Sequence, residues 1–89
     1  MLNFQDKVAI VTGASAGIGR ATAMAFAEQG ARVVVADINQ ELGEATAADI
    51  HAKGGKATFM LCDVTKEADV IALVDGTLET YGKLDMAFN

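Results

Sequence analysis

The residues Thr12-Gly13-Ala14-Ser15-Ala16-Gly17-Ile18-Gly19 form a glycine-rich turn between two contrasting stretches of sequence. The stretch before the turn, Lys7–Thr12 (KVAIVT), is rich in β-branched residues and predicts a strand. The stretch after it, Gly17–Gln29, has apolar residues at helical spacing and predicts a helix that stops at Gly30. Backbone N–H groups at the beginning of such a helix, together with the helix dipole, bind phosphate. The turn is therefore a candidate phosphate-binding site.

The three glycines of this turn suit three different tasks. Gly13 allows the bend, Gly17 leaves room for a pyrophosphate, and Gly19 lets the helix lie close to the sheet, while Ser15 offers a hydroxyl group. The spacing G-x-x-x-G-x-G differs from the G-x-G-x-x-G pattern, and no Gly-Lys-Ser/Thr follows as it would in a P-loop. The alternative interpretation is a turn that is glycine-rich for purely structural reasons.

Three more strands and two more helices are expected in the rest of the chain. The predicted strands are Arg32–Ala36, Lys56–Cys62 and Leu84–Phe88, and the predicted helices are Gln40–Lys53 and Thr65–Tyr81. Strands that alternate with helices are joined by right-handed crossovers and form a parallel sheet. The sequence therefore predicts an α/β fold, a Rossmann-type doubly wound parallel sheet in the order 3-2-1-4, truncated after the fourth strand.

The pattern within each helix also predicts its first residue and its buried face. Asn39 is expected to cap the second helix and Thr65 the third. The apolar stripes expected to face the sheet are, in turn, Ile18, Ala21, Ala25 and Phe26, then Leu42, Ala45, Ala48 and Ala52, then Ile71, Val74, Leu78 and Tyr81.

An acidic residue, Asp37, follows the second predicted strand and lies 18 residues after Gly19. In a dinucleotide site a carboxylate at this point accepts hydrogen bonds from the adenosine ribose and repels a 2′-phosphate. Neither Ala16 nor Ile38 supplies a cation for such a phosphate, and Arg20 is expected to point along its own helix. The residues thus favour NAD over NADP. An ordinary aspartate at the start of a turn is the alternative.

These features together resemble the short-chain dehydrogenase/reductase family over the whole chain. The resemblance rests on the turn T-G-x(3)-G-I-G at residues 12–19, on Asp37, on the segment CDVT at residues 62–65, and on LDMAFN at residues 84–89. It implies a nicotinamide dinucleotide as cofactor and a small-molecule alcohol or ketone as substrate, interconverted by hydride transfer. We also expect the full-length protein to be a homo-oligomer.

The resemblance also assigns roles to single residues. It implies that Asp63 accepts a hydrogen bond from the adenine amino group and that Val64 lines the adenine pocket. Ser15 and Ile18 are implied to contact the phosphates. Asn89 corresponds to the first residue of the family's Asn-Asn-Ala-Gly segment, which supports the central sheet and lies along the cofactor.

The catalytic residues of the family, a Ser and a Tyr-x-x-x-Lys pair helped by an Asn, have no counterpart in this sequence. Tyr81 does not qualify, because Asp85 stands where the lysine would be, and we expect it to make the last apolar contact of its helix. Residues 1–89 are thus expected to be the N-terminal part of a single dinucleotide-binding domain that lacks its catalytic half and is inactive alone. A non-catalytic dinucleotide-binding or sensing module, complete at this length, is the alternative.

Composition excludes several other classes of protein. Seven basic and twelve acidic residues give a formal net charge of −5, which argues against partners such as nucleic acid or an anionic membrane surface. No apolar run approaches the ~20 residues that span a bilayer. Cys62 is the only cysteine and His51 the only histidine, so we expect no disulfide and no metal site. The first seven residues lack the layout of a signal peptide, which favours a cytoplasmic location.

Overall fold

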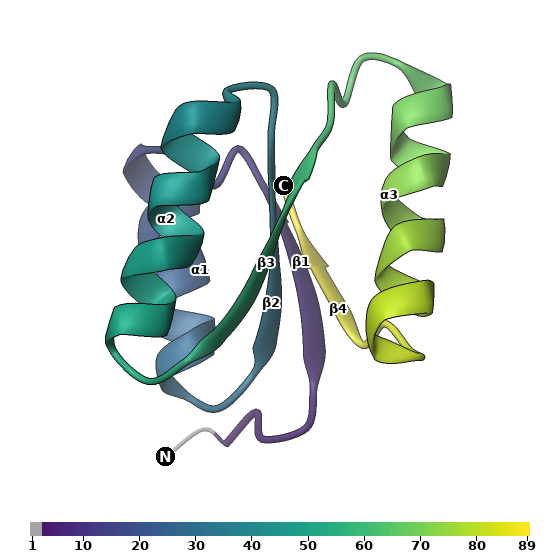
Figure 1. Cartoon of the computed structure of the whole chain (residues 1–89). Helices are drawn as coiled ribbons and strands as arrows, with labels where there is room; N and C mark the ends of the chain where they lie inside the picture. The colour runs from purple at the N-terminus through teal and green to yellow at the C-terminus, as the bar shows by residue number, and fades with distance from the viewer. Residues whose placement is uncertain (1–2) are drawn as a thin grey trace.

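The computed structural model describes residues 3–89, so Met1 and Leu2, the start of the segment tested for a signal peptide, lie outside the described residues. Strands and helices alternate throughout (Figure 1). In chain order they are β1 (Val8–Thr12), α1 (Gly17–Glu28), β2 (Arg32–Asp37), α2 (Gln40–Ala52), β3 (Lys56–Leu61), α3 (Glu67–Tyr81) and β4 (Met86–Phe88).

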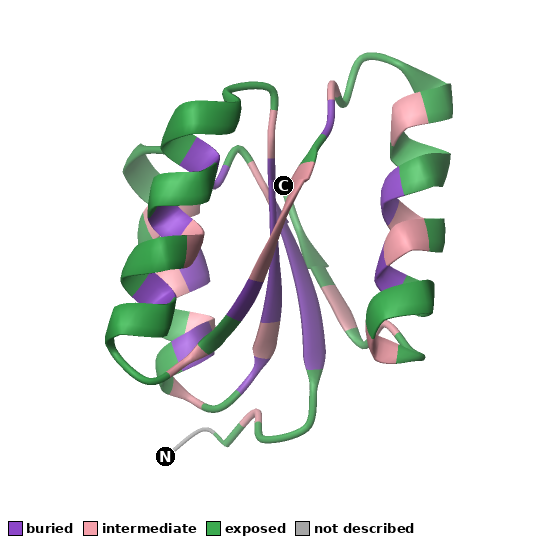
Figure 2. Ribbon diagram, in the orientation of Figure 1, coloured by how far each residue is buried: buried purple, intermediate pink, exposed green. Residues whose placement is uncertain are grey.

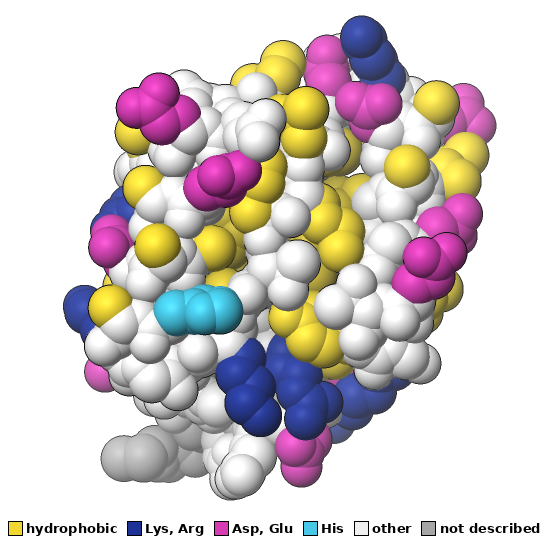
Figure 3. All heavy atoms as spheres, viewed as in Figure 1, with side chains coloured by type: hydrophobic (Ala, Val, Ile, Leu, Met, Phe, Trp, Pro, Cys, Tyr) yellow, Lys and Arg dark blue, Asp and Glu magenta, His cyan; other side chains and the backbone are white. Residues whose placement is uncertain are grey.

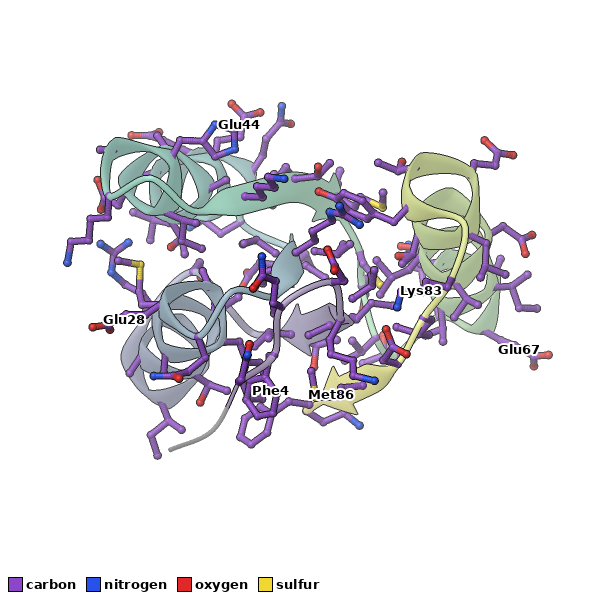
Figure 4. All side chains as sticks on the ribbon, turned by 90° about the horizontal axis from the view of Figure 1, so that it is seen from below. Phe4, Glu28, Glu44, Glu67, Lys83 and Met86 are labelled. Atoms are coloured by element: carbon purple, nitrogen blue, oxygen red, sulfur yellow. The ribbon has the colours of Figure 1, made fainter. Side chains whose placement is uncertain are left out.

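The four strands form one parallel sheet in the order β3-β2-β1-β4, which confirms the predicted topology. Val8 of β1 lies opposite Arg32 of β2, and Arg32 lies opposite Lys56 of β3. Helices α1 and α2 cover one face of the sheet and α3 covers the other, as right-handed crossovers require (Figure 1). Figure 4, a view from below, shows the two layers of helices with Phe4 and Met86 at the lower end of the sheet.

The core consists mainly of β1 and β2, whose residues are buried on both faces (Figure 2). Val11, Val33 and Val35 pack toward α1 and α2, whereas Ile10 and Val34 pack in a second cluster with Leu73 of α3. Because both faces are covered, these strands read as continuous apolar runs instead of alternating ones. On the first face, Phe4 packs edge to face against Phe26, with the ring centroids 5.5 Å apart.

The fourth strand is shorter than predicted, because it begins at Met86 and not at Leu84. Leu84 packs against the core cluster beneath α3. The backbone N–H of Val8 donates to Oδ2 of Asp85 at 2.8 Å, so this carboxylate occupies the place of a strand partner at the start of β1. The other elements end within one or two residues of the predicted positions.

The predicted buried stripe of α2 is wrong, and those of α1 and α3 are wrong in part, since Phe26 and Tyr81 do pack against the core. The residues that face the sheet are Ala23 and Ala27 in α1, Gly43, Thr46 and Ile50 in α2, and Leu73 and Thr77 in α3. Ile18, Leu42, Ile71 and Leu78, which were expected to be buried, are exposed instead. Close approach explains the difference at α2, where a Cβ at Gly43 would lie 2.2 Å from the ring of Phe59. The glycine at this position lets α2 approach the sheet closely, and the neighbouring Leu42 remains exposed.

One of the two predicted helix caps is confirmed. The side chain of Asn39 accepts a hydrogen bond from the backbone N–H of Leu42 at 3.0 Å at the beginning of α2. Thr65 does not cap α3, because Lys66 occupies the cap position and makes no side-chain cap bond. The hydroxyl of Thr65 donates instead to Asp63, at 2.6 Å.

The face of the sheet beneath α3 is only partly covered. A groove of about 690 Å³ lies between α3 and strands β1 and β4, lined mostly by apolar side chains such as Ile10, Val70 and Leu84. Figure 3 shows hydrophobic side chains between the strands and α3. Within residues 3–89, no helix has the length and apolar character needed to cross a membrane.

Candidate functional site

The carboxyl ends of the four parallel strands lie at one edge of the sheet, and residues at the ends of β1, β2 and β3 form a pocket of about 140 Å³ there. Ligands of open α/β sheets bind at this edge, where the strand order reverses. Five predicted site residues and Cys62 meet in this pocket, which is lined by Gly13, Asp37, Ile38, Cys62, Asp63 and Val64. Residues far apart in the sequence are thus brought together by the topology.

The glycine turn has the geometry that its three tasks require. Gly13 and Gly17 have φ values of 64° and 58°, in the left-handed region that costs other residues about 1–2 kcal/mol. A Cβ at Gly17 would meet no atom within 4 Å, so the space beside it is open. A Cβ at Gly19 would lie 2.1 Å from the carbonyl oxygen of Gly13, which means that only glycine lets α1 approach the turn this closely.

The electrostatics at the N-terminus of α1 favour a negatively charged group. Ala16 caps the helix without a side-chain hydrogen bond, and the first turn contains no acidic residue. The N-terminus of α2 differs, because Asn39 caps it and Glu41 lies in its first turn. Uncapped N–H groups and the positive end of the helix dipole both stabilise a nearby negative charge. The first turn of α1 therefore offers backbone donors that no side chain among residues 3–89 caps.

The carboxylate of Asp37 lies directly beside this turn. Its Oδ2 accepts from the backbone N–H of Ser15 at 3.1 Å, and its Oδ1 accepts from the backbone N–H of Asn39 at 2.9 Å. Partial burial opposes ionisation, but the hydrogen bonds from Asn39 and Ser15 outweigh it and lower the pKa of Asp37. The side chain is therefore a negatively charged acceptor at neutral pH.

Asp63 is held in a second network on the other side of the pocket. The hydroxyl and the backbone N–H of Thr65 donate to its Oδ1 and, with the nearby Lys66, lower the pKa of Asp63. Its own backbone N–H donates to Oδ2 of Asp69 at 3.0 Å. Val64 follows on the pocket wall with 57% of its surface exposed, which leaves an apolar side chain free to contact a ligand.

Asn89 lies at the end of β4, beside the end of β1. The hydroxyl of Thr12 donates to Oδ1 of Asn89 at 3.0 Å and also approaches the carbonyl oxygen of Phe88 at 3.3 Å. Asn89 also lines the apolar groove beneath α3, together with Gly13 and Val64. The side chain thus links the ends of β1 and β4 at the boundary between the pocket and the groove.

Five predicted site residues line neither the pocket nor the groove, namely Ser15, Ala16, Gly17, Ile18 and Gly19. The predicted direction of the Arg20 side chain is wrong. Ile18 is 78% exposed on the first turn of α1 and lines neither the pocket nor the groove, and Ala16 is exposed beside it. Arg20 does not point along α1 but crosses to α2, where it donates to Thr46 and pairs with Asp49. Of the side chains that line the pocket, none is cationic.

The structure adds residues that the sequence analysis did not place in the site. Cys62 is buried, and its thiol forms part of the pocket wall. Burial, with Asp69 and Asp63 nearby, raises the pKa of this thiol, so it remains neutral. Thr12 and Asp69 position Asn89 and Asp63. Asp69 lies in the first turn of α3, where an acid is a recognisable capping signal, whereas Thr12 gave no signal beyond ending a strand.

The other candidate residues form no metal site or catalytic group within the described part of the chain. Within residues 3–89, no three His, Cys, Asp or Glu side chains lie close enough together to hold a metal ion. The hydroxyl of Tyr81 pairs with that of Thr58 at 2.8 Å while its ring packs beneath α3, so Tyr81 makes the structural contact that was predicted.

Four parallel strands in this order, with the glycine turn after β1 and the acid after β2, define a Rossmann-type α/β fold. The sequence profile of the short chain dehydrogenase family matches residues 7–89, and the chain belongs to this family. Members of the family use NAD(H) or NADP(H). The relatives of this chain include proteins named as dehydrogenases and reductases, so the family is one of oxidoreductases.

Named relatives support this assignment. The chain is 54% identical over 85 residues to "Tropinone reductase-like 1" from Erythroxylum coca, an alignment that covers 96% of this chain and 30% of the relative. It is 47% identical over 89 residues to "3beta-hydroxysteroid dehydrogenase" from Mediterraneibacter gnavus, which covers all of this chain and 32% of the relative. The chain therefore spans about a third of the length of the curated relatives that it matches.

A solved structure confirms the fold. The crystal structure of hydroxysteroid dehydrogenase from Escherichia coli superposes with a TM-score of 0.94 and 41% sequence identity. The match covers 96% of this chain and 36% of that protein.

Proposed function

We propose that this segment forms the NAD(H)-binding part of a short-chain oxidoreductase that interconverts an alcohol and a carbonyl compound. The observation that carries the proposal is the position of Asp37, whose ionised carboxylate lies at the end of β2 and is bonded to the glycine turn through Ser15. An adenosine ribose held there would offer its hydroxyl donors to this acceptor. A 2′-phosphate would bring negative charge against it.

The residues around the pocket fit a dinucleotide. Open space beside Gly17 and the uncapped N-terminus of α1 suit a pyrophosphate. The pocket between Asp37 and Asp63 suits the adenosine end, with Val64 as its apolar wall. The cofactor, when bound, would supply the hydride that passes to or from the substrate carbon.

Each residue of the site then has a defined task. Gly13 and Gly17 present the backbone of the turn, and Gly19 holds α1 against it. Asp63 would accept from the adenine amino group, and Asn89 would lie along the cofactor while it holds β4 to Thr12. Ser15 and Ile18 would contact the phosphates, Ile18 through its backbone N–H, since its side chain projects into solvent.

The substrate and the catalytic groups are proposed from the family. Relatives named as a reductase and as a hydroxysteroid dehydrogenase favour a small-molecule alcohol or ketone as substrate. The Ser and Tyr-x-x-x-Lys of the resemblance do not occur among these 89 residues. We therefore propose that proton transfer needs residues outside this segment, and that the segment supplies the cofactor site.

The test is cofactor binding by the protein that carries this segment, measured by calorimetry with NAD⁺ and NADP⁺ under the same conditions. The expected result is tighter binding of NAD⁺, by about tenfold or more, which corresponds to about 1.4 kcal/mol. Equal affinity would refute the role of Asp37 in selectivity. Failure to bind either dinucleotide would refute the proposed function as a whole.

A further inference from the structure

A single arginine makes the polar contact between α1 and α2. One terminal nitrogen of the Arg20 guanidinium donates to the hydroxyl of Thr46 at 2.9 Å, and the other pairs with the carboxylate of Asp49. Thr46 is completely buried, and its own hydroxyl donates to the carbonyl oxygen of Leu42. Arg20 therefore reaches into the interface between the helices and is not a cation extended into solvent.

The rest of the interface between these helices is loosely filled. A pocket of about 210 Å³ separates their C-terminal halves, and it is lined by Met24, Ala27, Glu28, Ile50, Lys53 and Gly55. Among the described residues of α1 and α2, Arg20 makes the side-chain hydrogen bonds that join the two helices. The contact joins the N-terminal half of α1, the end that follows the glycine turn, to the middle and C-terminal half of α2.

Each of these two helices begins directly after one part of the candidate site, either the glycine turn or the segment that contains Asp37. The glycine turn leads directly into α1, and Arg20 follows Gly19. Asp37 and Ile38 lead directly into α2 through the cap residue Asn39. A tie between the helices therefore also restrains the distance between the turn and the carboxylate, in addition to the single bond from Ser15 to Asp37.

We propose that Arg20 is a positioning residue for the dinucleotide site, which ties α1 to α2 so that the phosphate-binding turn and the ribose-binding carboxylate keep a fixed relative position. This inference rests on the proposed function. The planar guanidinium bridges two side chains three residues apart on α2, a geometry that the single ammonium of lysine does not reproduce. The same contact keeps the arginine away from the pocket, which leaves the ribose end without a cation.

The proposal predicts that affinity is lost only for ligands that contact both the glycine turn and Asp37. In the protein that carries this segment, Arg20→Gln and Asp49→Asn should each raise the dissociation constant for NAD⁺ by about fivefold or more, in line with couplings between residues of one network. Binding of adenosine, which lacks the phosphates, should be unchanged. In steady-state kinetics, KM for NAD⁺ should rise while kcat remains unchanged, and Arg20→Lys should give an intermediate effect.

The matched control is Arg32→Gln, which removes another arginine and its ion pair with Asp6 at the opposite end of the sheet. It should leave NAD⁺ and adenosine binding unchanged. If Arg20→Gln fails to fold, Asp49→Asn alone tests the proposal, because the Asp49 side chain is half exposed and its replacement should leave the fold intact. Unchanged NAD⁺ binding in the variants, an equal loss of adenosine binding, or an equal effect of Arg32→Gln would overturn the proposal. A parent protein that binds no NAD⁺ would instead refute the proposed function.

Discussion

The backbone N–H of Ser15 donates a hydrogen bond to the carboxylate of Asp37 at 3.1 Å, although 22 residues separate them in the sequence. One residue belongs to the glycine turn after β1 and the other ends β2. The bond joins the proposed phosphate-binding and ribose-binding parts of the site before any ligand arrives. It also lowers the pKa of Asp37, so that position and charge depend on the same contact.

Cofactor preference should therefore depend on the charge of Asp37. In the full-length protein, Asp37→Ser combined with Ile38→Arg should shift kcat/KM from NAD(H) toward NADP(H) by about tenfold or more, because a repulsive charge is replaced by an attractive one. The measurement is kcat/KM for both cofactors in the parent and the variant.

Asp37→Asn is the matched control for that experiment. It removes the charge but keeps an oxygen that can accept from Ser15 or Asn39, so it separates charge repulsion from loop position. It should weaken selectivity without reversing it. A parent protein that prefers NADP(H) would contradict the assignment of Asp37.

Gly17 should matter for binding more than for folding. Gly17→Ala forces a side chain into a backbone with φ of 58° and places its Cβ in the open space proposed for the pyrophosphate. Gly54→Ala is the matched control, since its φ is 84° and its surroundings are also empty, but it lies in the loop after α2.

Both variants should lose a similar amount of stability, about 1–2 kcal/mol, and only Gly17→Ala should lose NAD⁺ affinity. Thermal unfolding and calorimetric titration check the two parts separately. A loss of affinity in proportion to stability in both variants would show that Gly17 serves the fold alone.

Acid should destabilise the chain partly through Asp85. The N–H of Val8, and then the ammonium of Lys83, lower the pKa of Asp85 below its ordinary value of 3.8. A carboxylate whose pKa is lower in the folded state stabilises that state above pH ~4 and loses this contribution as the pH falls through the folded pKa. Asp85→Asn should therefore show a weaker decline of stability between about pH 5 and pH 3.

Urea unfolding across this pH range measures the effect. Lys83→Gln, which removes the ion pair but leaves the Val8 hydrogen bond, should retain most of the parent's pH dependence. If the free energy of unfolding depends on pH equally in the parent and in Asp85→Asn, Asp85 does not contribute to the acid destabilisation.

The 89-residue chain on its own should catalyse no hydride transfer and should self-associate. β4 pairs with β1 on one side only, and the apolar groove beside it lies open between α3 and the sheet. An unpaired strand edge beside an apolar surface is a template for pairing with another chain. Sedimentation velocity and an assay for turnover test the two statements.

Phe88→Lys, which places a charge on β4, should reduce the association, whereas Leu61→Lys on the opposite edge strand should reduce it less. A monodisperse and cooperatively melting chain that binds NAD⁺ at micromolar concentration would contradict the prediction. It would favour a binding module that functions at this length.

The sequence alone determined the strand order, the glycine turn and the position of Asp37. These features depend on local signals: β-branched runs mark strands, glycines mark positions with left-handed backbone or close approach, and right-handed crossovers leave few topologies. Asn39 was predictable for the same reason, because a cap bonds to a residue three positions along the chain.

Tertiary structure decided which faces of the helices are buried and which side chains complete the site. Alanines of α1 occur on several faces of the helix, so its apolar pattern did not distinguish Ala23 and Ala27 from Ala21 and Ala25. Contact with the sheet decided that the first pair is buried. The bond from Val8 to Asp85 joins residues 77 apart, and Arg20 reaches across to a second helix. Partners so distant leave no periodic signal in the sequence, because only the packing of the elements brings them within hydrogen-bonding distance.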